Sequence, residues 1–239
     1  MPAAESTPNH SCFAEDAGQI RVRAAGRLWT LDRPADLESL WQAIASEEDT
    51  PPEFLEDERL PYWVELWPAS IALADWLRLN RERIAGRLCL DLGCGLGLSA
   101  LAAADQGAKV LAMDYEAEAL RYARRNAALN DIPPERRPLW SVMDWRFPAV
   151  RKQALDFIWG GDVMYERRFV TPVLDFFEHA LARDGAIWLA EPNRNVYDEF
   201  RAALFSRGWK SRRVHTCLVE PLHVQEAKIN VSLWELSLA

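Results

Sequence analysis

The stretch "DFIWGGDVMYE", residues 156–166, joins an apolar run to a carboxylate and a phenol. The letters "FIW" predict a buried strand that two glycines interrupt, and Asp162 and Tyr165 follow at its end. A carboxylate in this position can hold and orient a nitrogen through a charge-assisted hydrogen bond. The alternative is structural, in that Asp162 would cap the helix that follows and Tyr165 would only pack.

A second group of residues suited to ligand binding lies in "LCLDLGCGLGLSALAAA", between a predicted strand and its helix. It holds one acid and three alternate glycines, Asp91, Gly93, Gly95 and Gly97. Glycine lets the backbone approach a ligand closely, and the N-terminus of the next helix offers free N–H groups. Nicotinamide and flavin sites use G-x-G-x-x-G/A, and Leu98 fills the last of these positions, so the spacing disfavours them.

Further polar residues follow the next two predicted strands. Asp114 ends "VLAMD", where its carboxylate could accept hydrogen bonds from the hydroxyls of a ribose. Any nucleoside cofactor would offer those hydroxyls, so Asp114 does not indicate which nucleoside cofactor is bound. The spacing of the glycines is the feature that distinguishes between them. Asp144 and Trp145 follow the third strand, in "SVMDW". Because parallel strands end at one edge of a sheet, these residues are expected to border the same crevice as Asp162.

The elements that position these residues alternate from Pro61 onward. Strands are predicted within 86–93, 109–114, 137–145, 154–162 and 185–192, and helices at 67–80, 96–107, 115–130, 166–182 and 195–209. Two strand-like runs then follow without a helix between them, at 212–220 and 228–238. The pattern predicts an α/β fold with a doubly wound, mostly parallel seven-stranded sheet, helices on both faces and an antiparallel C-terminal hairpin.

Residues 1–60 are predicted to form an N-terminal extension that packs on a main domain at 61–239. The extension would comprise a frayed tail, a β-hairpin of 20–22 against 28–31, a short helix at 34–44 and an acidic linker. Its first residues lack the basic and apolar regions of a signal peptide. No apolar run approaches the ~20 residues that a membrane-spanning helix needs.

The composition limits the class of partner. A net charge of −8 and a pI near 5.1 disfavour nucleic acid and favour a cationic ligand or a basic protein segment. The histidines show no ligand spacing, so no metal site is expected. The four cysteines are scattered along the chain, at Cys12, Cys89, Cys94 and Cys217, and we interpret them as reduced thiols of a cytoplasmic protein. A monomer is the default expectation.

Two motifs together resemble a known family. The D-x-G-x-G-x-G run from Asp91 resembles motif I of class I methyltransferases that use S-adenosylmethionine. The D-x-x-Y pattern in "GGDVMYE" resembles methyltransferase family 16, and both prolines of the N/D-P-P-Y/F pattern of other amino methyltransferases are missing. The resemblance covers Pro61 to the end and includes "LDLGCGLG", "MDW" and "DVMY". It implies a Rossmann-like fold, S-adenosylmethionine as methyl donor, and a lysine side chain of a particular protein as acceptor.

The resemblance also implies a role for each candidate residue. Asp162 and Tyr165 would be catalytic, orienting and enclosing the acceptor amine, and the N-terminal hairpin would help to choose the substrate. Residues of "LAEPNR" would line the substrate mouth, namely Glu191, Asn193 and Arg194. The cofactor, released as S-adenosylhomocysteine, would contact Trp67, Asp91, Gly93, Gly95, Gly97, Asp114, Tyr115, Asp144, Trp145 and Gly161.

Two other functions fit the same residues. A methyltransferase for a small amine would use the same carboxylate and cofactor loop. A non-catalytic module that binds the cofactor or a partner protein would keep the motifs as structure alone. In the leading hypothesis the acceptor is a lysine, whose pKa of ~10.4 leaves almost no neutral amine at pH 7, so the site must favour loss of a proton.

Overall fold

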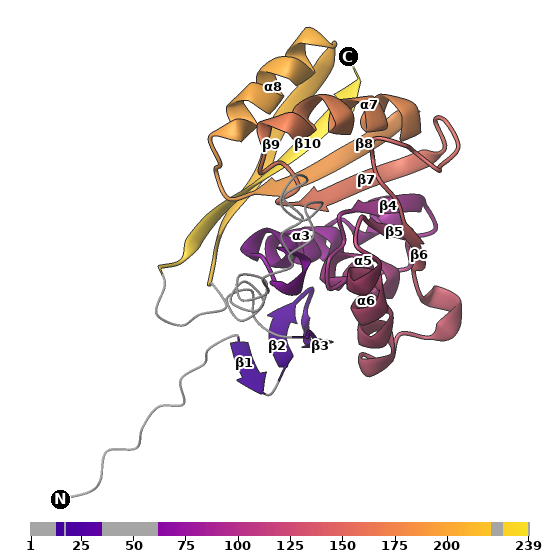
Figure 1. Ribbon diagram of the computed structural model, residues 1–239, viewed down its shortest axis with the longest axis vertical. Coiled ribbons are helices and arrows are strands. Elements are labelled where there is room, and N and C mark those ends of the chain that lie inside the picture. Colours follow the sequence, from indigo (N-terminus) through magenta and orange to yellow (C-terminus); the bar gives the residue numbers. More distant parts are fainter. Residues whose placement is uncertain (1–12, 17, 35–61, 221–226, 239) are drawn as a thin grey trace, which may run out of the picture.

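The computed structural model describes residues 13–16, 18–34, 62–220 and 227–238. They form a seven-stranded sheet with surrounding helices and a separate three-stranded sheet (Figure 1). Of the predicted tail, only residues 13–16 and 18 lie in the described part of the chain. The helix predicted at 34–44, apart from its first residue, and the acidic linker lie outside it, as do His10, Cys12 and His223. Among the helices in the described ranges, none is both long and apolar enough to cross a bilayer.

The large sheet confirms the predicted doubly wound plan. Its strand order is β6-β5-β4-β7-β8-β10-β9, and the pairings from β6 to β8 are all parallel. The strands are β4 (Leu88–Leu92), β5 (Lys109–Asp114), β6 (Leu139–Val142), β7 (Leu155–Gly161), β8 (Leu181–Glu191), β9 (Trp209–Val219) and β10 (Ile229–Leu238). The predicted C-terminal hairpin is antiparallel, with β10 paired to both β8 and β9, so the last strand lies inside the sheet.

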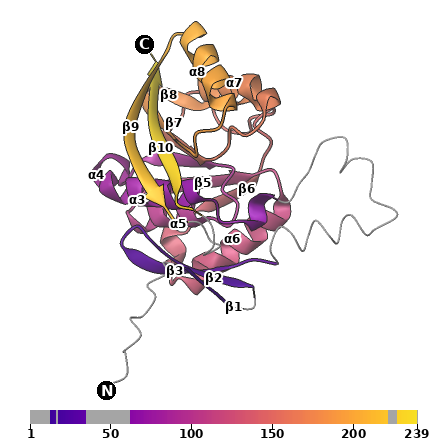
Figure 2. The same ribbon diagram turned by 90° about the vertical axis from the view of Figure 1, so that its left-hand side faces the viewer.

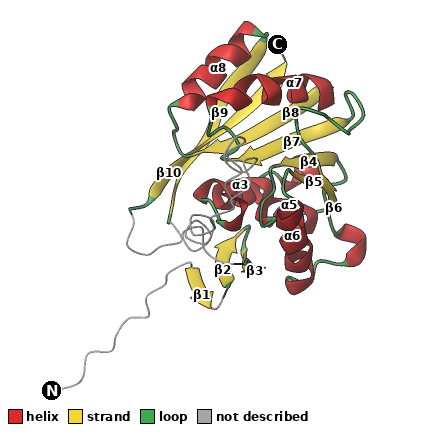
Figure 3. Ribbon diagram, viewed as in Figure 1, coloured by secondary structure: helices red, strands yellow, loops and turns green. Residues whose placement is uncertain are grey.

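Helices cover both faces of this sheet (Figure 3). One group shares an apolar cluster with the N-terminal hairpin: α3 (Pro68–Leu79), α5 (Leu98–Asp105) and α6 (Ala117–Leu129). The other group packs in a second cluster: α7 (Val170–Ala180) and α8 (Val196–Ser206). Short helical turns complete the fold: η1 (Tyr62–Val64), α4 (Arg81–Ile84), η2 (Pro134–Arg136) and η3 (Arg167–Phe169). Burial on both faces explains why the middle of a strand such as β7 is a continuous apolar run, residues 157–159.

Two boundaries around α7 differ from the prediction. The helix expected at 166–182 begins with the separate turn η3, and α7 itself ends at Ala180. Strand β8 begins at Leu181 rather than at 185. The reason is a shift in the ladder, because Leu181 pairs with Leu155 before the register changes between Leu155 and Phe157.

The order in which successive strands are added to the sheet reverses next to β4. Strands β5 and β6 lie on one side of β4, and β7 and the later strands lie on the other. The loops that leave β4 and β7 therefore diverge beyond the carboxyl ends of the strands, which is where open α/β sheets bind ligands. The glycine loop follows β4 and Asp162 follows β7, so the topology brings the two motifs to one crevice.

The predicted N-terminal hairpin is present and lies against helix α6 (Figure 2). It consists of β2 (Gln19–Ala24) and β3 (Arg27–Asp32), and a third strand that was not predicted, β1 (Phe13–Asp16), extends it. Asn126 on α6 and Asn130, which directly follows the last residue of the helix, bond to the free edge of β3. Asn126 accepts from the Asp32 N–H at 2.7 Å, and Asn130 accepts from the Thr30 N–H at 2.9 Å.

Replacing Asn126 by alanine is expected to destabilise the protein by about 2–3 kcal/mol, because buried partners would be left unsatisfied. The side chain is fully buried, accepts from Asp32 N and donates to Leu96 O at 3.0 Å. Urea unfolding measures the change. The control is Arg125→Ala, which removes a half-exposed ion pair to Asp32 and should cost about 0–1 kcal/mol. Equal losses in the two variants would contradict the role of Asn126.

Candidate active site

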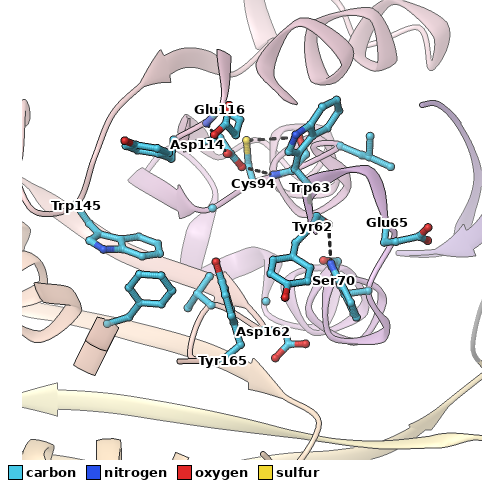
Figure 4. A pocket seen from close by; sticks show the side chains of 18 of the residues that line it. Tyr62, Trp63, Glu65, Ser70, Cys94, Asp114, Glu116, Trp145, Asp162 and Tyr165 are labelled. Carbon is cyan, nitrogen blue, oxygen red and sulfur yellow. Dashed lines mark hydrogen bonds between the residues drawn. The ribbon is translucent and has the colours of Figure 1, made fainter. Parts of the chain in front are cut away.

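A pocket of about 280 Å³ lies at the carboxyl ends of the parallel strands. Loops after β4, β5, β6 and β7 line it, together with η1 and the start of α3. Figure 4 shows Tyr62, Tyr165 and Asp162 beside one another, while Asp114 and Trp145 border other sides of the pocket. The structure therefore brings most of the predicted site residues to one cavity: Trp67, Gly93, Gly95, Gly97, Asp114, Tyr115, Asp144, Trp145, Gly161, Asp162 and Tyr165.

The glycine loop has a backbone that other residues would adopt only with strain. Gly95 and Gly97 have φ of 51° and 90°, in the left-handed region that favours glycine. A Cβ added to Gly97 would lie 3.0 Å from the Cβ of Ala123. Gly97 directly precedes α5, so the loop presents backbone at the N-terminus of a helix, where N–H groups lack partners within the helix.

Asp114 fixes this loop from the end of β5. Its carboxylate accepts hydrogen bonds from the Gly95 N–H at 2.8 Å and from the Glu116 N–H at 3.0 Å. The residue is 8% exposed and lines the pocket. Burial raises the pKa of Asp114 to about 6, although the backbone hydrogen bonds oppose the rise.

Asp91, the first residue of the glycine motif, does not line the pocket. It is buried behind the loop, where it accepts a hydrogen bond from Ser99 Oγ at 2.6 Å. Burial raises the pKa of Asp91 to about 7. Its observed contact joins the end of β4 to the first turn of α5, so it supports the loop rather than facing the cavity.

Asp144 and Trp145 border the pocket after β6. Both carboxylate oxygens of Asp144 bind Arg146, with Oδ1 accepting from the backbone N–H and Oδ2 from Nε, each at 2.8 Å. The ring of Trp145 meets Phe169 edge to face at 5.1 Å. Tyr115, which is 38% exposed, lines the same region. An aromatic wall beside a carboxylate suits a flat ring that carries hydrogen-bond donors.

Asp162 does not cap the helix that follows, because α7 begins at Val170 with Phe169 in the capping position. Its backbone is left-handed, with φ of 54°, and its N–H donates to Ala190 O at 2.8 Å. The carboxylate lies in a two-bond ion pair, accepting from Nε and Nη2 of Arg194 at 2.6 Å each. Burial raises the pKa of Asp162, and Arg194 opposes that rise.

Aromatic rings line the pocket together with Asp162. Tyr165 contacts Tyr62 and Phe169 edge to face, at 5.3 Å and 5.2 Å between ring centroids. Burial raises the pKa of the Tyr165 phenol, so it stays neutral at physiological pH. Trp67 lies 6.2 Å from Tyr62 and donates its Nε1–H to the Tyr62 carbonyl at 2.9 Å. These rings give the site a partly apolar wall next to a charged group.

The predicted substrate-mouth residues at the end of β8 lie outside the main pocket. Asn193 and Arg194 instead line a second hollow, which Tyr165 separates from the pocket as a shared wall. Glu191 is buried and accepts from Trp234 Nε1 at 3.1 Å and from the Arg194 N–H at 3.1 Å. Arg194 thus reaches the site through Asp162, while Glu191 holds the loop.

Several lining residues were not predicted, above all Tyr62, Glu65 and Phe169. Tyr62 and Glu65 belong to "YWVELW", before α3, where the cluster of aromatic residues was a usable signal. Phe169 follows the D-x-x-Y motif by one turn. Its place opposite Trp145 depends on η3, which the sequence does not distinguish from ordinary helix.

The chain is similar in sequence to known methyltransferases. A family model described as lysine methyltransferase matches residues 53–204. The electron transfer flavoprotein beta subunit lysine methyltransferase of Danio rerio is 33% identical over 141 residues, which are 58% of this chain and 53% of that protein. The chain thus spans about half the length of this relative. Protein N-lysine methyltransferase METTL21A of Danio rerio is 27% identical over 75% of this chain and 83% of its own.

A solved structure shares the fold. Magnesium protoporphyrin IX methyltransferase from Synechocystis PCC 6803, with bound SAM, has a TM-score of 0.56 at 16% identity. The match covers 84% of this chain and 91% of that one. At this identity the likeness supports the arrangement of strands and helices alone.

Proposed function

The chain belongs to the lysine methyltransferase family, methyltransferase family 16, and from this premise we propose that it methylates a lysine side chain of a protein. The methyl donor would be S-adenosylmethionine. The observation that carries the proposal is that Asp162 and Tyr165 line the same pocket as the glycine loop and Asp114. A nucleotide site alone would not need a buried carboxylate and a phenol at its other end.

The pocket residues suit this cofactor. The left-handed backbone of Gly95 and Gly97 lets the loop itself line the pocket, and a Cβ at Gly97 would press against Ala123 at 3.0 Å and displace the loop. Asp114 would accept hydrogen bonds from the ribose hydroxyls, and Asp144 and Trp145 would hold the adenine. Trp67, Tyr115 and Gly161 would complete the enclosure, and Asp91 would act through the loop. When bound, the cofactor supplies a methyl group on a sulfonium and leaves as the neutral thioether S-adenosylhomocysteine.

The acceptor side chain must reach the donor as a neutral amine. Asp162 would accept a hydrogen bond from an amine N–H and so aim the lone pair at the methyl carbon. Tyr165 and Tyr62 would enclose the lysine stem and keep water away from the amine. The new bond would join the lysine nitrogen to the methyl carbon while the carbon–sulfur bond breaks, and the proton that leaves the ammonium to make the amine neutral would already have passed to bulk water. Alignment supplies most of the rate in this scheme.

The partner would be a protein that presents a lysine at the loops after β7 and β8. Two of the relatives are named for lysine methylation of proteins, one of them of the electron transfer flavoprotein beta subunit. We propose that subunit as the first substrate to test. We further propose that the chain acts as a cytoplasmic monomer, with 61–239 as the methyltransferase domain and 1–60 as an extension that helps to choose the substrate.

The deciding experiment incubates the full chain with methyl-labelled S-adenosylmethionine and either a cell lysate or purified electron transfer flavoprotein beta subunit. Label should enter few protein bands and be recovered as N-methyl-lysine after hydrolysis. Label that stays in the small-molecule fraction would replace the proposal with a small-amine methyltransferase. Cofactor binding without transfer to any component would indicate a non-catalytic module.

A further inference from the structure

The ion pair between Asp162 and Arg194 joins the candidate acceptor site to the end of the neighbouring strand. Asp162 is 8% exposed, and both of its carboxylate oxygens are bonded to the guanidinium at 2.6 Å. The side chain of Arg194 is 38% exposed and its guanidinium carbon lies 5.9 Å from the ring centre of Trp67. The carboxylate assigned to the amine is therefore already paired with a cation.

The backbone holds Arg194 in this position. Its N–H donates to Glu191 at 3.1 Å, and the preceding Asn193 adopts a left-handed φ of 60°. Asn193 also donates to the Asn230 carbonyl at 2.9 Å and accepts from Ser232 Oγ at 3.1 Å, so β10 anchors the loop. These contacts hold the backbone of Arg194 independently of Asp162, so its side chain extends from a fixed position next to the carboxylate.

The charge of the acceptor site follows from its neighbours. The titratable groups that face the pair are the phenols of Tyr62 and Tyr165 and the carboxyl of Glu191. The phenols are uncharged when protonated, and Glu191 lines neither the pocket nor the second hollow. The negative charge of Asp162 and the positive charge of Arg194 thus nearly cancel. A sulfonium beside this pair would leave the site with a net positive charge. An ammonium entering such a site is repelled, whereas a free amine is not.

We propose that Arg194 stays paired with Asp162 during the reaction and makes the acceptor site electrically neutral, so that lysine is taken as the free amine. The inference rests on the proposed function and deepens it. Arg194 acts through Asp162 and is a positioning residue. The proton is lost to water before the amine enters, and no group of the protein needs to remove it.

The first test measures charge at the site without any acceptor. Calorimetry gives the affinities for S-adenosylmethionine, which carries a sulfonium, and for S-adenosylhomocysteine, which is neutral. Arg194→Gln leaves Asp162 unpaired and should shift the affinity ratio toward S-adenosylmethionine by roughly fivefold or more. Asp162→Asn leaves the guanidinium unpaired and should shift the ratio the opposite way. Arg194→Lys should keep the ratio of the wild type.

The second test places an amine at the position of the transferred methyl. Sinefungin is a cofactor analogue with an amine in place of the methylsulfonium group. Relative to S-adenosylhomocysteine, it should bind the wild type more tightly as the pH rises from about 7 to about 9, because the neutral fraction of an alkylamine grows about tenfold per pH unit below its pKa of ~10. In Arg194→Gln the cationic amine can pair with Asp162, so this preference should vanish or reverse. Equal pH dependence in both proteins would overturn the inference, because Arg194 would then be moving aside.

The control is Arg167→Gln. Arg167 lines the same second hollow, but its side chain is 78% exposed and pairs with Glu199 at 2.7 Å. If Arg167→Gln shifts the affinity ratio as much as Arg194→Gln does, the shift reflects the loss of any nearby positive charge, and the inference fails. A merely structural role for Arg194 would weaken binding of both ligands equally. A wild type that binds neither ligand would instead refute the proposed function.

Discussion

Asp162→Asn is expected to lower methyl transfer at least about a hundredfold, because the amide can no longer aim the acceptor amine with a charged oxygen. Affinity for S-adenosylhomocysteine should change by less than about threefold, since the neutral product makes no ionic contact with this carboxylate. The variant should fold, because the asparagine Oδ1 can still accept from Arg194, whose side chain is 38% exposed and so keeps contact with water where it stands. Single-turnover labelling of the protein acceptor measures the chemical step directly.

The matched control is Asp156→Asn on the same strand. Asp156 lies at the amino end of β7, where it accepts from the Leu88 N–H at 2.9 Å and pairs with Arg87. Removing that charge leaves the pocket intact, so transfer should be kept. Transfer at the wild-type rate in Asp162→Asn would contradict the assigned role. A parallel loss of cofactor binding would make Asp162 part of the donor site instead.

The sheet was predictable because its strands are long apolar runs separated by amphipathic helices. Even the C-terminal hairpin followed from the missing helix between residues 212–220 and 228–238. Strand β1 was not predictable, because "FAED" has no alternation and depends on the edge of β2 for its hydrogen bonds. The start of β8 at Leu181 likewise depends on a register shift in its neighbour. Both features are decided by partners distant in sequence.

In the candidate site, too, some features could be predicted from the local sequence and others depend on partners distant in sequence. Residues at strand ends, such as Asp114 and Trp145, lie in the pocket because the topology alone carries them there. Asp91 belongs to the same motif, but its side chain points to Ser99 in the helix behind the loop, which spacing does not reveal. The pairing of Asp162 with Arg194 joins the loops after two adjacent strands, and each loop contains a left-handed residue, Asp162 or Asn193. That geometry is not encoded in any local pattern.

Cofactor affinity is expected to fall as the pH drops through about 6, the raised pKa of Asp114. The ionised carboxylate accepts from Gly95 and Glu116 and would accept the ribose hydroxyls, whereas the protonated acid loses acceptor capacity. Since burial raises this pKa, the ionised carboxylate that binds the cofactor predominates above pH about 6 and is replaced by the protonated acid below it. Calorimetry with S-adenosylhomocysteine, whose thioether carries no charge, should show a plateau at neutral pH and a decline in mild acid.

Asp114→Asn should lower the affinity at neutral pH by roughly tenfold or more, because hydrogen bonds to a charged acceptor are lost. It should also flatten the pH dependence, since the titrating group is gone. Asp91→Asn is the matched control, because Asp91 is equally buried, has its pKa raised to about 7 and does not line the pocket. A decline that persists in Asp114→Asn but disappears in Asp91→Asn would assign the titration to Asp91. The carboxylate at the end of β4, rather than that of β5, would then control cofactor binding.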